Sequence, residues 1–360
     1  MQESLSRARV EIDLGALQRN GTVVARRAGV PLLPMIKADA YGLGVREVLP
    51  ALDRLDPWGY GVGTIDEGEE LREFGVSRPI VIFTPLLDAD LQRARKARLT
   101  PTLGFRQEIQ SWRKCGGGPW HLSIDTGMSR AGIPWRRIDD IRAELESSPP
   151  EGAFTHFHSA QLNDGTMQEQ EQLFRDAVAR LPSRPRFLHT DNSAAIARRQ
   201  RSEWDLVRPG IFLYGVGSGS GAAMQPEPVV HLRAPIVEIR DVAAGDTVSY
   251  DATFRAEHAC RIATLAVGYA DGYPRALSGV GAVLIGGALG PVAGRVTMDM
   301  TMVDVSTIRC AVGDTATLIG RDGDTVLTLE RVGERAGVSP YELLTGLRSR
   351  VQHKYLGRSN

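Results

Sequence analysis

The sequence predicts a (β/α)₈ barrel followed by a second, mainly β domain. Short apolar runs with the length of buried strands alternate with amphipathic stretches of helical spacing over roughly 200 residues, as in such barrels. Beyond about residue 225, alternating or apolar runs are bounded by Gly-Asp and Gly-Gly turns, which is typical of an all-β domain. No G-x-G-x-x-G motif follows the first expected barrel strand, which disfavours an open dinucleotide-binding sheet.

Within the barrel, the apolar runs predict eight strands and the stretches between them predict helices. The expected strands are Leu32–Lys37, Trp58–Gly63, Ile80–Phe83, Leu99–Thr102, Trp120–Ile124, Ala153–Phe157, Arg186–His189 and Asp205–Arg208. The expected helices include Val45–Leu55, Ile65–Phe74, Leu91–Ala97, Trp135–Leu145 and Met167–Leu181. The run Leu99–Thr102 is the weakest of the strands, so a count of seven also fits the pattern.

The pattern also marks the ends of the two expected domains. Residues 8–13 alternate and predict a strand, and Asp13 is a suitable N-cap for a helix that ends near Gly29. We expect the barrel to span residues 14–225 and the second domain residues 231–360, with Gly217–Pro228 as a linker. The strands expected in the second domain are Pro235–Ile239, Thr247–Tyr250, Arg261–Val267, Ala282–Ile285, Val292–Arg295, Met300–Val305 and Thr315–Ile319, with helices at Leu327–Ala336 and Pro340–Leu347.

Composition excludes several classes of partner. Lys+Arg and Asp+Glu balance at 43 each, so the net charge favours neither nucleic acid nor an anionic membrane surface. The first residues lack the apolar stretch of a secretory signal, and no apolar run is long enough to span a bilayer. The three cysteines form no C-x-x-C motif, which suits free thiols rather than a structural zinc site. We therefore expect a cytoplasmic protein.

Lys37 is the first candidate catalytic residue. It follows the apolar run 32–36, and Tyr41-Gly42-Leu43-Gly44 predicts a loop leading into a helix. A lysine partly withdrawn from water at a strand end is available as a nucleophile or base, and its best-known use is a Schiff base with pyridoxal phosphate. The alternative is a lysine whose ammonium group reaches solvent.

Other polar residues follow the later strands, where barrel enzymes place their catalytic groups. Such barrels commonly bind a phosphate group on the loops after the last two strands, which here carry Ser193 and Gly210. Ser193 would donate its hydroxyl and N–H at the start of a helix, and Gly210 would let the backbone approach the phosphate. The alternative for Ser193 is a plain N-cap.

Six motifs, in order along nearly the whole chain, resemble those of the alanine racemases, a family of pyridoxal-phosphate enzymes. They are Met-Ile-Lys-Ala-Asp-Ala-Tyr-Gly at 35–42, Asp-Thr-Gly-Met-Ser-Arg at 125–130, Asn-Ser-Ala-Ala at 192–195, Arg-Pro-Gly-Ile at 208–211, Val-Gly-Tyr-Ala-Asp-Gly-Tyr at 267–273 and Gly-Arg-Val-Thr-Met-Asp at 294–299. The resemblance implies pyridoxal 5'-phosphate as cofactor, interconversion of L- and D-alanine, and a homodimer with shared active sites. It also implies that the strand 8–13 belongs to the second domain.

The resemblance implies two bases, because one side chain cannot easily serve both faces of a planar carbanion. Lys37 corresponds to the Schiff-base lysine and the base on the D face. Tyr269 corresponds to the base on the L face, reaching the site from the partner subunit. A phenol needs tuning to act as a base at neutral pH, and the resemblance implies that His156 and Arg208 belong to the tuning network. Without the resemblance, Tyr269 would be interpreted as a core tyrosine with a bonded hydroxyl.

The remaining roles are also implied by the resemblance. Arg208 would face the pyridine nitrogen of the cofactor and, having no proton to spare, would keep it unprotonated. Arg130 would hold the phenolic oxygen of the cofactor and steer the substrate carboxylate, which the backbone of Met298 from the partner would also contact. The other positions that match cofactor contacts are Tyr41, Asn192, Ser193, Gly210, Ile211 and Tyr341. The pair His156 and His158 could bind a metal, but no suitably spaced carboxylates accompany it, and we expect no metal.

Two positions depart from the family pattern. Many members carry a carbamylated lysine where this chain has Ser123, so Arg130 needs another partner, for which we expect water or chloride. Thr297 stands where a cysteine is common. These differences leave open a racemase of serine or of a broader range of small amino acids.

Two other classes remain possible from the sequence. One is a decarboxylase on the same barrel, although Arg208 disfavours it because decarboxylation requires a stronger electron sink. The other is a non-catalytic pyridoxal-phosphate carrier, although such proteins resemble the barrel alone.

Overall fold

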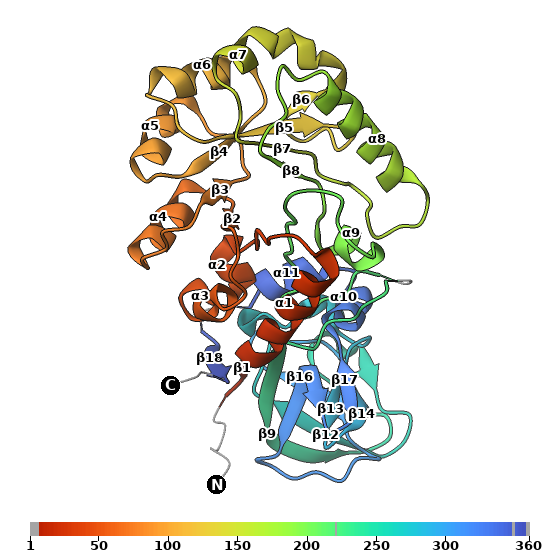
Figure 1. Ribbon diagram of the computed structural model, residues 1–360. Coiled ribbons are helices and arrows are strands. Elements are labelled where there is room, and N and C mark those ends of the chain that lie inside the picture. The colour runs from red at the N-terminus through yellow and green to blue at the C-terminus, as the bar shows by residue number, and fades with distance from the viewer. Residues whose placement is uncertain (1–6, 220–221, 348–349, 358–360) are drawn as a thin grey trace.

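The computed structural model describes residues 7–219, 222–347 and 350–357. The first half of the chain forms a barrel of parallel strands surrounded by helices, and the second half forms a mainly β domain beside it (Figure 1). Six barrel strands pair in order: β2 (Tyr60–Val62), β3 (Ile80–Ile82), β4 (Thr100–Leu103), β5 (His121–Asp125), β7 (Gly152–Phe154) and β8 (Phe187–His189). The short β6 (Ile133–Pro134) pairs with β5. The structure confirms the predicted fold class.

The two remaining barrel positions are filled by segments that are not regular strands. Residues 32–36 and 205–208 make only isolated bridges, Leu32 to Val207, Met35 to Gly61 and Arg208 to Asn192, together with a few backbone hydrogen bonds. The prediction of regular strands at Leu32–Lys37 and Asp205–Arg208 was therefore wrong in detail. Two prolines, Pro31 and Pro34, lack the N–H that a longer ladder would need.

Helices follow most barrel strands and cover them from outside (Figure 1). Asp13 caps the first helix by accepting a 2.8 Å hydrogen bond from Ala16 N, and Gly29 ends it in the left-handed conformation that a C-cap requires. The sequence did not predict α6, of which only Ile109 and Trp112 are buried, too few for a clear apolar period. The helical elements of this half are α1 (Leu14–Ala28), α2 (Lys37–Gly42), α3 (Val45–Asp53), α4 (Ile65–Glu73), α5 (Asp88–Lys96), α6 (Arg106–Lys114), the 3₁₀ helix η1 (Trp135–Ile141), α7 (Arg142–Ser147), α8 (Thr166–Ala179) and α9 (Ser193–Arg198).

The second domain is organised around one long strand, β9 (Val230–Val242). It pairs antiparallel with β12 (Cys260–Leu265) on one side and with β1 (Arg9–Asp13) and β16 (Thr315–Asp322) elsewhere along its length. The remaining strands are β10 (Thr247–Val248), β11 (Phe254–Arg255), β13 (Ala282–Ile285), β14 (Ala288–Pro291), β15 (Thr301–Asp304), β17 (Thr325–Leu327) and β18 (Gln352–Leu356). The helical elements are η2 (Tyr250–Ala252), η3 (Tyr269–Asp271), η4 (Arg275–Leu277), α10 (Leu329–Ala336) and α11 (Pro340–Thr345).

Two details of this domain differ from expectation. The strand expected at Val292–Arg295 does not form: β14 ends at Pro291, Val292 makes only an isolated bridge to Val303, and the chain bends at Gly294 with φ 77°. The helix expected from Leu327 begins at Leu329, since Thr328 caps it and Leu327 belongs to β17.

The beginning and end of the described chain meet in the second domain. Strand β1 pairs parallel with β18 and antiparallel with β9 (Figure 1). One continuous cluster of buried apolar side chains extends from the barrel into the second domain. Within the described ranges, no helix is both long and apolar enough to cross a bilayer.

Candidate active site

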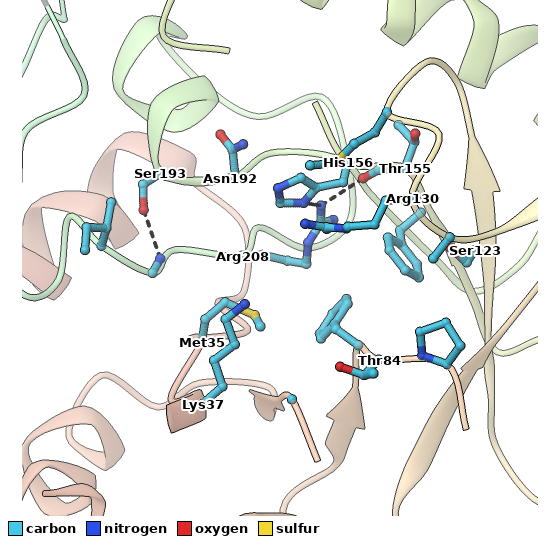
Figure 2. Close-up of a pocket in the computed structure, with 18 of the residues that line it drawn as sticks. Met35, Lys37, Thr84, Ser123, Arg130, Thr155, His156, Asn192, Ser193 and Arg208 are labelled. Atoms are coloured by element: carbon cyan, nitrogen blue, oxygen red, sulfur yellow. Dashed lines mark hydrogen bonds between the residues drawn. The ribbon is translucent and has the colours of Figure 1, made fainter. Parts of the chain in front are cut away.

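A cavity of about 580 Å³ opens at the carboxyl ends of the barrel strands. Its walls carry Lys37, Arg130, His156, Ser193 and Arg208, which come from five different segments of the barrel. Figure 2 shows these side chains around one hollow, with Ser193 and Asn192 toward one side and Ser123 toward the other. Its charged and polar lining suits an anionic small molecule.

Lys37 begins an unusual turn. The four residues that follow it, Ala38 to Tyr41, all have φ between 52° and 59°, so they form one left-handed turn. Glu67 in the first turn of α4 supports this turn, because its carboxylate accepts hydrogen bonds from the backbone N–H groups of Ala38 at 2.7 Å and Gly63 at 2.6 Å. Glu67 thus stabilises a strained backbone segment directly after Lys37, the candidate nucleophile. Backbone strain is common at functional sites.

The surroundings of Lys37 favour its neutral form. Burial lowers its pKa, and the positive charge of Arg130 lowers it further, while the carboxylate of Glu67 opposes both effects. A larger fraction of the amine is therefore neutral near pH 7 than for an exposed lysine. Lys37 lines an open cavity and is exposed in the single chain, so the alternative of an ammonium group that reaches solvent also fits this position.

Arg208 is buried in the barrel axis, with 3% of the residue exposed. Its guanidinium donates to the backbone oxygens of His189 at 2.7 Å, Thr155 at 2.8 Å and Thr190 at 3.1 Å. Burial is the main cause that lowers its pKa to about 9, which still leaves the group charged at neutral pH. The fold therefore fixes a permanent cation in the floor of the cavity.

Two buried histidines extend from Arg208 into the barrel interior. Arg208 Nη1 lies 2.8 Å from His189 Nδ1, and His189 Nε2 lies 2.9 Å from His121 Nδ1. Because a guanidinium only donates, His189 Nδ1 accepts, its Nε2–H donates to His121 Nδ1, and His121 carries its own proton on Nε2. Burial and the charge of Arg208 lower the pKa of both rings, that of His121 to about 3. The sequence analysis missed this chain of hydrogen bonds.

The H-x-H pair divides between two environments. His156 lies at the cavity with its Nδ1 3.3 Å from Arg208 Nη2, and burial, Arg208 and Arg130 lower its pKa to about 3. His158 is exposed and its Nδ1 lies 2.7 Å from Ser159 Oγ. The two rings therefore do not form a chelating pair.

The Ser193 end of the cavity is built from two loops that face each other. The N-cap of α9 is Asn192, whose side chain accepts from Ala194 N and Ala195 N, both at 3.1 Å. The N-cap alternative for Ser193 was therefore wrong. The Ser193 hydroxyl instead accepts from Gly210 N at 2.9 Å, as Figure 2 shows. A Cβ at Gly210 would lie 2.6 Å from the Tyr41 hydroxyl, so only glycine allows this close approach.

Aromatic side chains close the same end of the cavity. Tyr41 packs against Tyr214 and Tyr341, with ring centroids 4.7 and 6.0 Å apart, and burial raises the pKa of Tyr41 and Tyr341. Tyr341 reaches the cavity because α11 packs on the left-handed turn, where a Cβ at Gly42 would lie 2.7 Å from Leu344 O. Ile211 also lines the cavity. These residues could enclose a phosphate group and hold it by hydroxyl and backbone donors.

Arg130 lies at the opposite end of the cavity, beside Ser123. In the part of the chain that the structure describes, Arg130 makes no ion pair with a carboxylate. Asp125, the nearest acid in its loop, instead accepts from Gly127 N and Ser129 N, both at 3.0 Å, and thereby shapes the loop. The guanidinium of Arg130 is thus available to an anion.

Tyr269 and Met298 do not line this cavity. Both lie on turns of the second domain, with 37% and 52% of the residue exposed. The two turns contact each other, since Tyr269 N donates to Thr297 O at 3.0 Å and Ala270 N donates to Met298 O at 3.1 Å. Within one chain, the structure therefore brings together all the sequence-predicted site residues except these two.

Comparisons with known proteins match both halves of the chain to domains of one family. Residues 12–218 match the alanine racemase N-terminal domain and residues 229–355 match the alanine racemase C-terminal domain. The alanine racemase of Citrifermentans bemidjiense is 36% identical, over 97% of this chain and 98% of that protein. The chain belongs to the alanine racemase family. The resemblance seen in the six motifs is thus confirmed.

Solved structures of the alanine racemase family agree over the whole fold. The Bartonella henselae alanine racemase with covalently bound pyridoxal phosphate gives a TM-score of 0.90 at 27% identity, covering 98% of this chain and 100% of that one. The Bacillus anthracis alanine racemase with bound L-Ala-P gives a TM-score of 0.88 at 30% identity, covering 98% and 96%.

Glu67, His189 and His121 are the site residues that sequence reasoning missed in this member of the alanine racemase family. The Thr64-x-x-Glu67 spacing is a capping-box signature, which the structure contains, and it could have placed Glu67 at the start of α4. A histidine inside each of two apolar strands, at 121 and 189, was the available signal for the buried chain.

Proposed function

We propose that the protein is a pyridoxal-5'-phosphate-dependent racemase that interconverts L-alanine and D-alanine with two bases. The observation that carries the proposal is the cavity lined by Lys37, an amine of lowered pKa, together with the buried cation Arg208. Membership of the alanine racemase family over both halves of the chain supports the same reaction.

The residues present fit this cofactor. The cavity is cationic through Arg130 and Arg208, which suits a molecule that carries a phosphate. Lys37 would hold the cofactor covalently, and Arg208 would face its pyridine nitrogen. The phosphate would be held by Tyr41, Ser193, Gly210, Ile211 and Tyr341, with Asn192 and His156 as neighbouring contacts. When bound, the cofactor withdraws electrons from the substrate α-carbon, so that the α-proton can be removed.

The side chains then divide the work by position. Lys37 would exchange the α-proton on the D face, and the Tyr269 hydroxyl would exchange it on the L face. Arg130 and the backbone of Met298 would hold the substrate carboxylate. Arg208 has no proton to give, so the electron withdrawal stays weak. A weak sink suits simple proton exchange better than decarboxylation.

We also infer a homodimer in which each active site is shared. Tyr269 and Met298 lie outside the Lys37 cavity of their own chain and are exposed, so a second copy would have to supply them. The tyrosines that line the cavity are Tyr41 and Tyr341, and they pack against each other at the Ser193 end. No tyrosine among the lining residues stands at the opposite end, where a base could face Lys37.

A broader substrate range, with serine as the first candidate, is the second function to consider. Ser123 lines the cavity near Arg130 and leaves room where many relatives have a lysine. Thr297 favours this alternative less, because its hydroxyl donates to Met300 O at 2.9 Å and accepts from Met300 N at 3.1 Å. That hydroxyl serves the turn rather than the substrate.

The test uses the cofactor-loaded protein in deuterium oxide with each alanine enantiomer. Deuterium at the α-carbon with inversion of configuration supports the proposal. Release of carbon dioxide would indicate a decarboxylase, and the absence of exchange a carrier. A panel of serine, lysine and arginine measured beside alanine decides the range, and turnover of any of them equal to that of alanine would contradict alanine specificity.

A further inference from the structure

The turn that carries Tyr269 and the turn that carries Met298 form one unit, which we call the loop pair (residues 268–272 and 297–300). Besides the two backbone hydrogen bonds between them, they touch very closely at Gly268, where a Cβ would lie 2.2 Å from Thr297 O. The Thr301 hydroxyl adds a 2.8 Å hydrogen bond to Val267 O just outside the pair. The positions of Tyr269 and Met298 are therefore linked through the backbone.

A buried carboxylate lies beneath the exposed Tyr269. Asp271 is fully buried, and its Oδ2 accepts from Gly268 N at 2.8 Å, which closes the turn around Tyr269. Two arginines neutralise it, with Arg350 Nε 2.8 Å from Oδ1 and Arg7 Nη2 3.4 Å from Oδ2. Burial raises the pKa of Asp271 and the neighbouring charge of Asp299 acts in the same direction, while Gly268 N–H and Arg7 lower it.

The same two arginines also hold the other turn of the loop pair. Arg350 Nη2 lies 2.6 Å from Asp299 Oδ1, and Arg7 Nη2 lies 3.2 Å from the same oxygen. Each arginine thus spans one carboxylate from the Tyr269 turn and one from the Met298 turn. Arg350 uses two nitrogens of its fork, Nε and Nη2, for the two carboxylates, whereas Arg7 makes both contacts through Nη2.

The two arginines come from opposite ends of the described chain. Arg7 lies just before β1 and Arg350 just before β18, and these two strands pair with each other at the edge of the large sheet. The two arginines therefore connect the loop pair to the segments that lead into β1 and β18. Nothing in the Lys37 cavity takes part in this network.

We propose that Asp271, held by Arg7 and Arg350, is a positioning residue that fixes the Tyr269 hydroxyl and the Met298 backbone relative to each other. The inference rests on the proposed function, in which Tyr269 is the L-face base. A rigid support is needed because the Tyr269 side chain projects from an exposed turn, and a displacement of about 1 Å can cost about 10²-fold in rate.

The test compares Asp271→Asn with the parent protein by two readouts. The first, made without cofactor, is amide hydrogen exchange at Tyr269 and Ala270, whose N–H groups bond to the Met298 turn. We expect it to accelerate roughly tenfold. The second is α-deuterium exchange in the loaded enzyme. We expect racemisation to fall by about 10²-fold while D-alanine still exchanges through Lys37.

Arg350→Gln is the milder variant if Asp271→Asn does not fold, and Arg93→Gln is its matched control. Arg93 is similarly exposed, at 46% against 38% of the side chain, and also bridges two carboxylates, Asp66 and Glu69, far from the loop pair. We expect Arg93→Gln to leave both readouts unchanged and Arg350→Lys to restore only part of the loss caused by Arg350→Gln.

Equal losses of racemisation and D-alanine exchange in Asp271→Asn, or no loss of either, would overturn the positioning role. The proposed function is judged separately by Tyr269→Phe. If that variant keeps D-alanine exchange but loses L-alanine exchange while Asp271→Asn behaves like the parent, only the positioning inference fails. If Tyr269→Phe itself leaves L-alanine exchange intact, the L-face assignment fails.

Discussion

Lys37 lies in a cavity whose walls come mainly from the barrel, whereas Tyr269 lies on an exposed turn of the second domain. Around Lys37, partial burial and the charge of Arg130 lower the pKa of the amine, and hydrogen bonds hold Arg208 from several sides. Around Tyr269, the backbone is fixed by Asp271 but 37% of the residue is exposed. One half of the proposed site is complete within a chain, and the other half needs a second chain.

This difference predicts unequal responses to mutation. Changes around Lys37 should affect cofactor retention and both directions of proton exchange, whereas changes around Tyr269 should affect one face of the substrate and leave cofactor retention unchanged.

The largest effect is expected for Lys37→Ala. It removes both the covalent anchor and the D-face base, so turnover should fall by more than the roughly 10²- to 10⁴-fold that one general base contributes. The chain has four lysines, so borohydride reduction and mass spectrometry can locate the cofactor without ambiguity, at Lys37 and not at Lys96, Lys114 or Lys354. Lys96→Ala on α5 is the matched control, and turnover retained by Lys37→Ala would refute this assignment.

The next effect is expected for Tyr269→Phe. Racemisation should fall by about 10²- to 10⁴-fold, equally in both directions because the overall equilibrium is fixed. The α-proton exchange of recovered D-alanine should persist, whereas that of L-alanine should be lost. Nuclear magnetic resonance of each enantiomer in deuterium oxide measures both, and equal retention or equal loss of exchange would argue against a one-face role.

A smaller effect is expected for His189→Leu, which breaks the buried chain between Arg208 and His121. Loss of a hydrogen bond to a charged donor should lower the free energy of unfolding by about 1.5–3 kcal/mol. Activity should fall less than in Tyr269→Phe, because three backbone oxygens still hold Arg208. Urea unfolding measures the loss of stability, and racemisation rates measure the loss of activity. His258→Leu, at an exposed histidine, is the control. An activity loss without a stability loss would show that the histidines do more than support Arg208.

The smallest effect concerns pH. Because burial and Arg130 lower the pKa of Lys37, uptake of pyridoxal phosphate by the cofactor-free protein should become rapid at a lower pH than for an exposed lysine, whose pKa is about 10.4. Arg130→Gln removes a positive charge and should shift the profile to higher pH. Glu67→Gln removes a negative charge and should shift it to lower pH. Absorbance of the bound cofactor measures uptake, and shifts in the opposite directions would contradict the charge argument.

The fold could be predicted from the sequence because strand and helix periods alternate with little interruption through the barrel. Two barrel segments were misjudged, since Leu32–Ile36 has the composition of a strand but pairs only through isolated bridges. The left-handed turn at Ala38–Tyr41 could not be predicted, because it depends on Glu67 and α11, which are distant in sequence.

The cavity residues could be predicted because they follow strand ends and lie in motifs. The buried chain through His189 and His121 and the support through Asp271 could not. They depend on which side chains meet across the barrel axis or between the two ends of the chain, and local sequence does not show which residues such long-range pairs join. The domain limits, the shared site and the role of each residue remain predictions.

The central claim is that a complete site combines Lys37 of one subunit with Tyr269 of the other. It is tested most directly by mixing Lys37→Ala and Tyr269→Phe proteins, each inactive alone, and separating the hybrid dimers by two affinity tags. A hybrid dimer contains one site with both intact residues, so the account predicts about half of the parent activity per dimer. Hybrid dimers that form but remain inactive would contradict it.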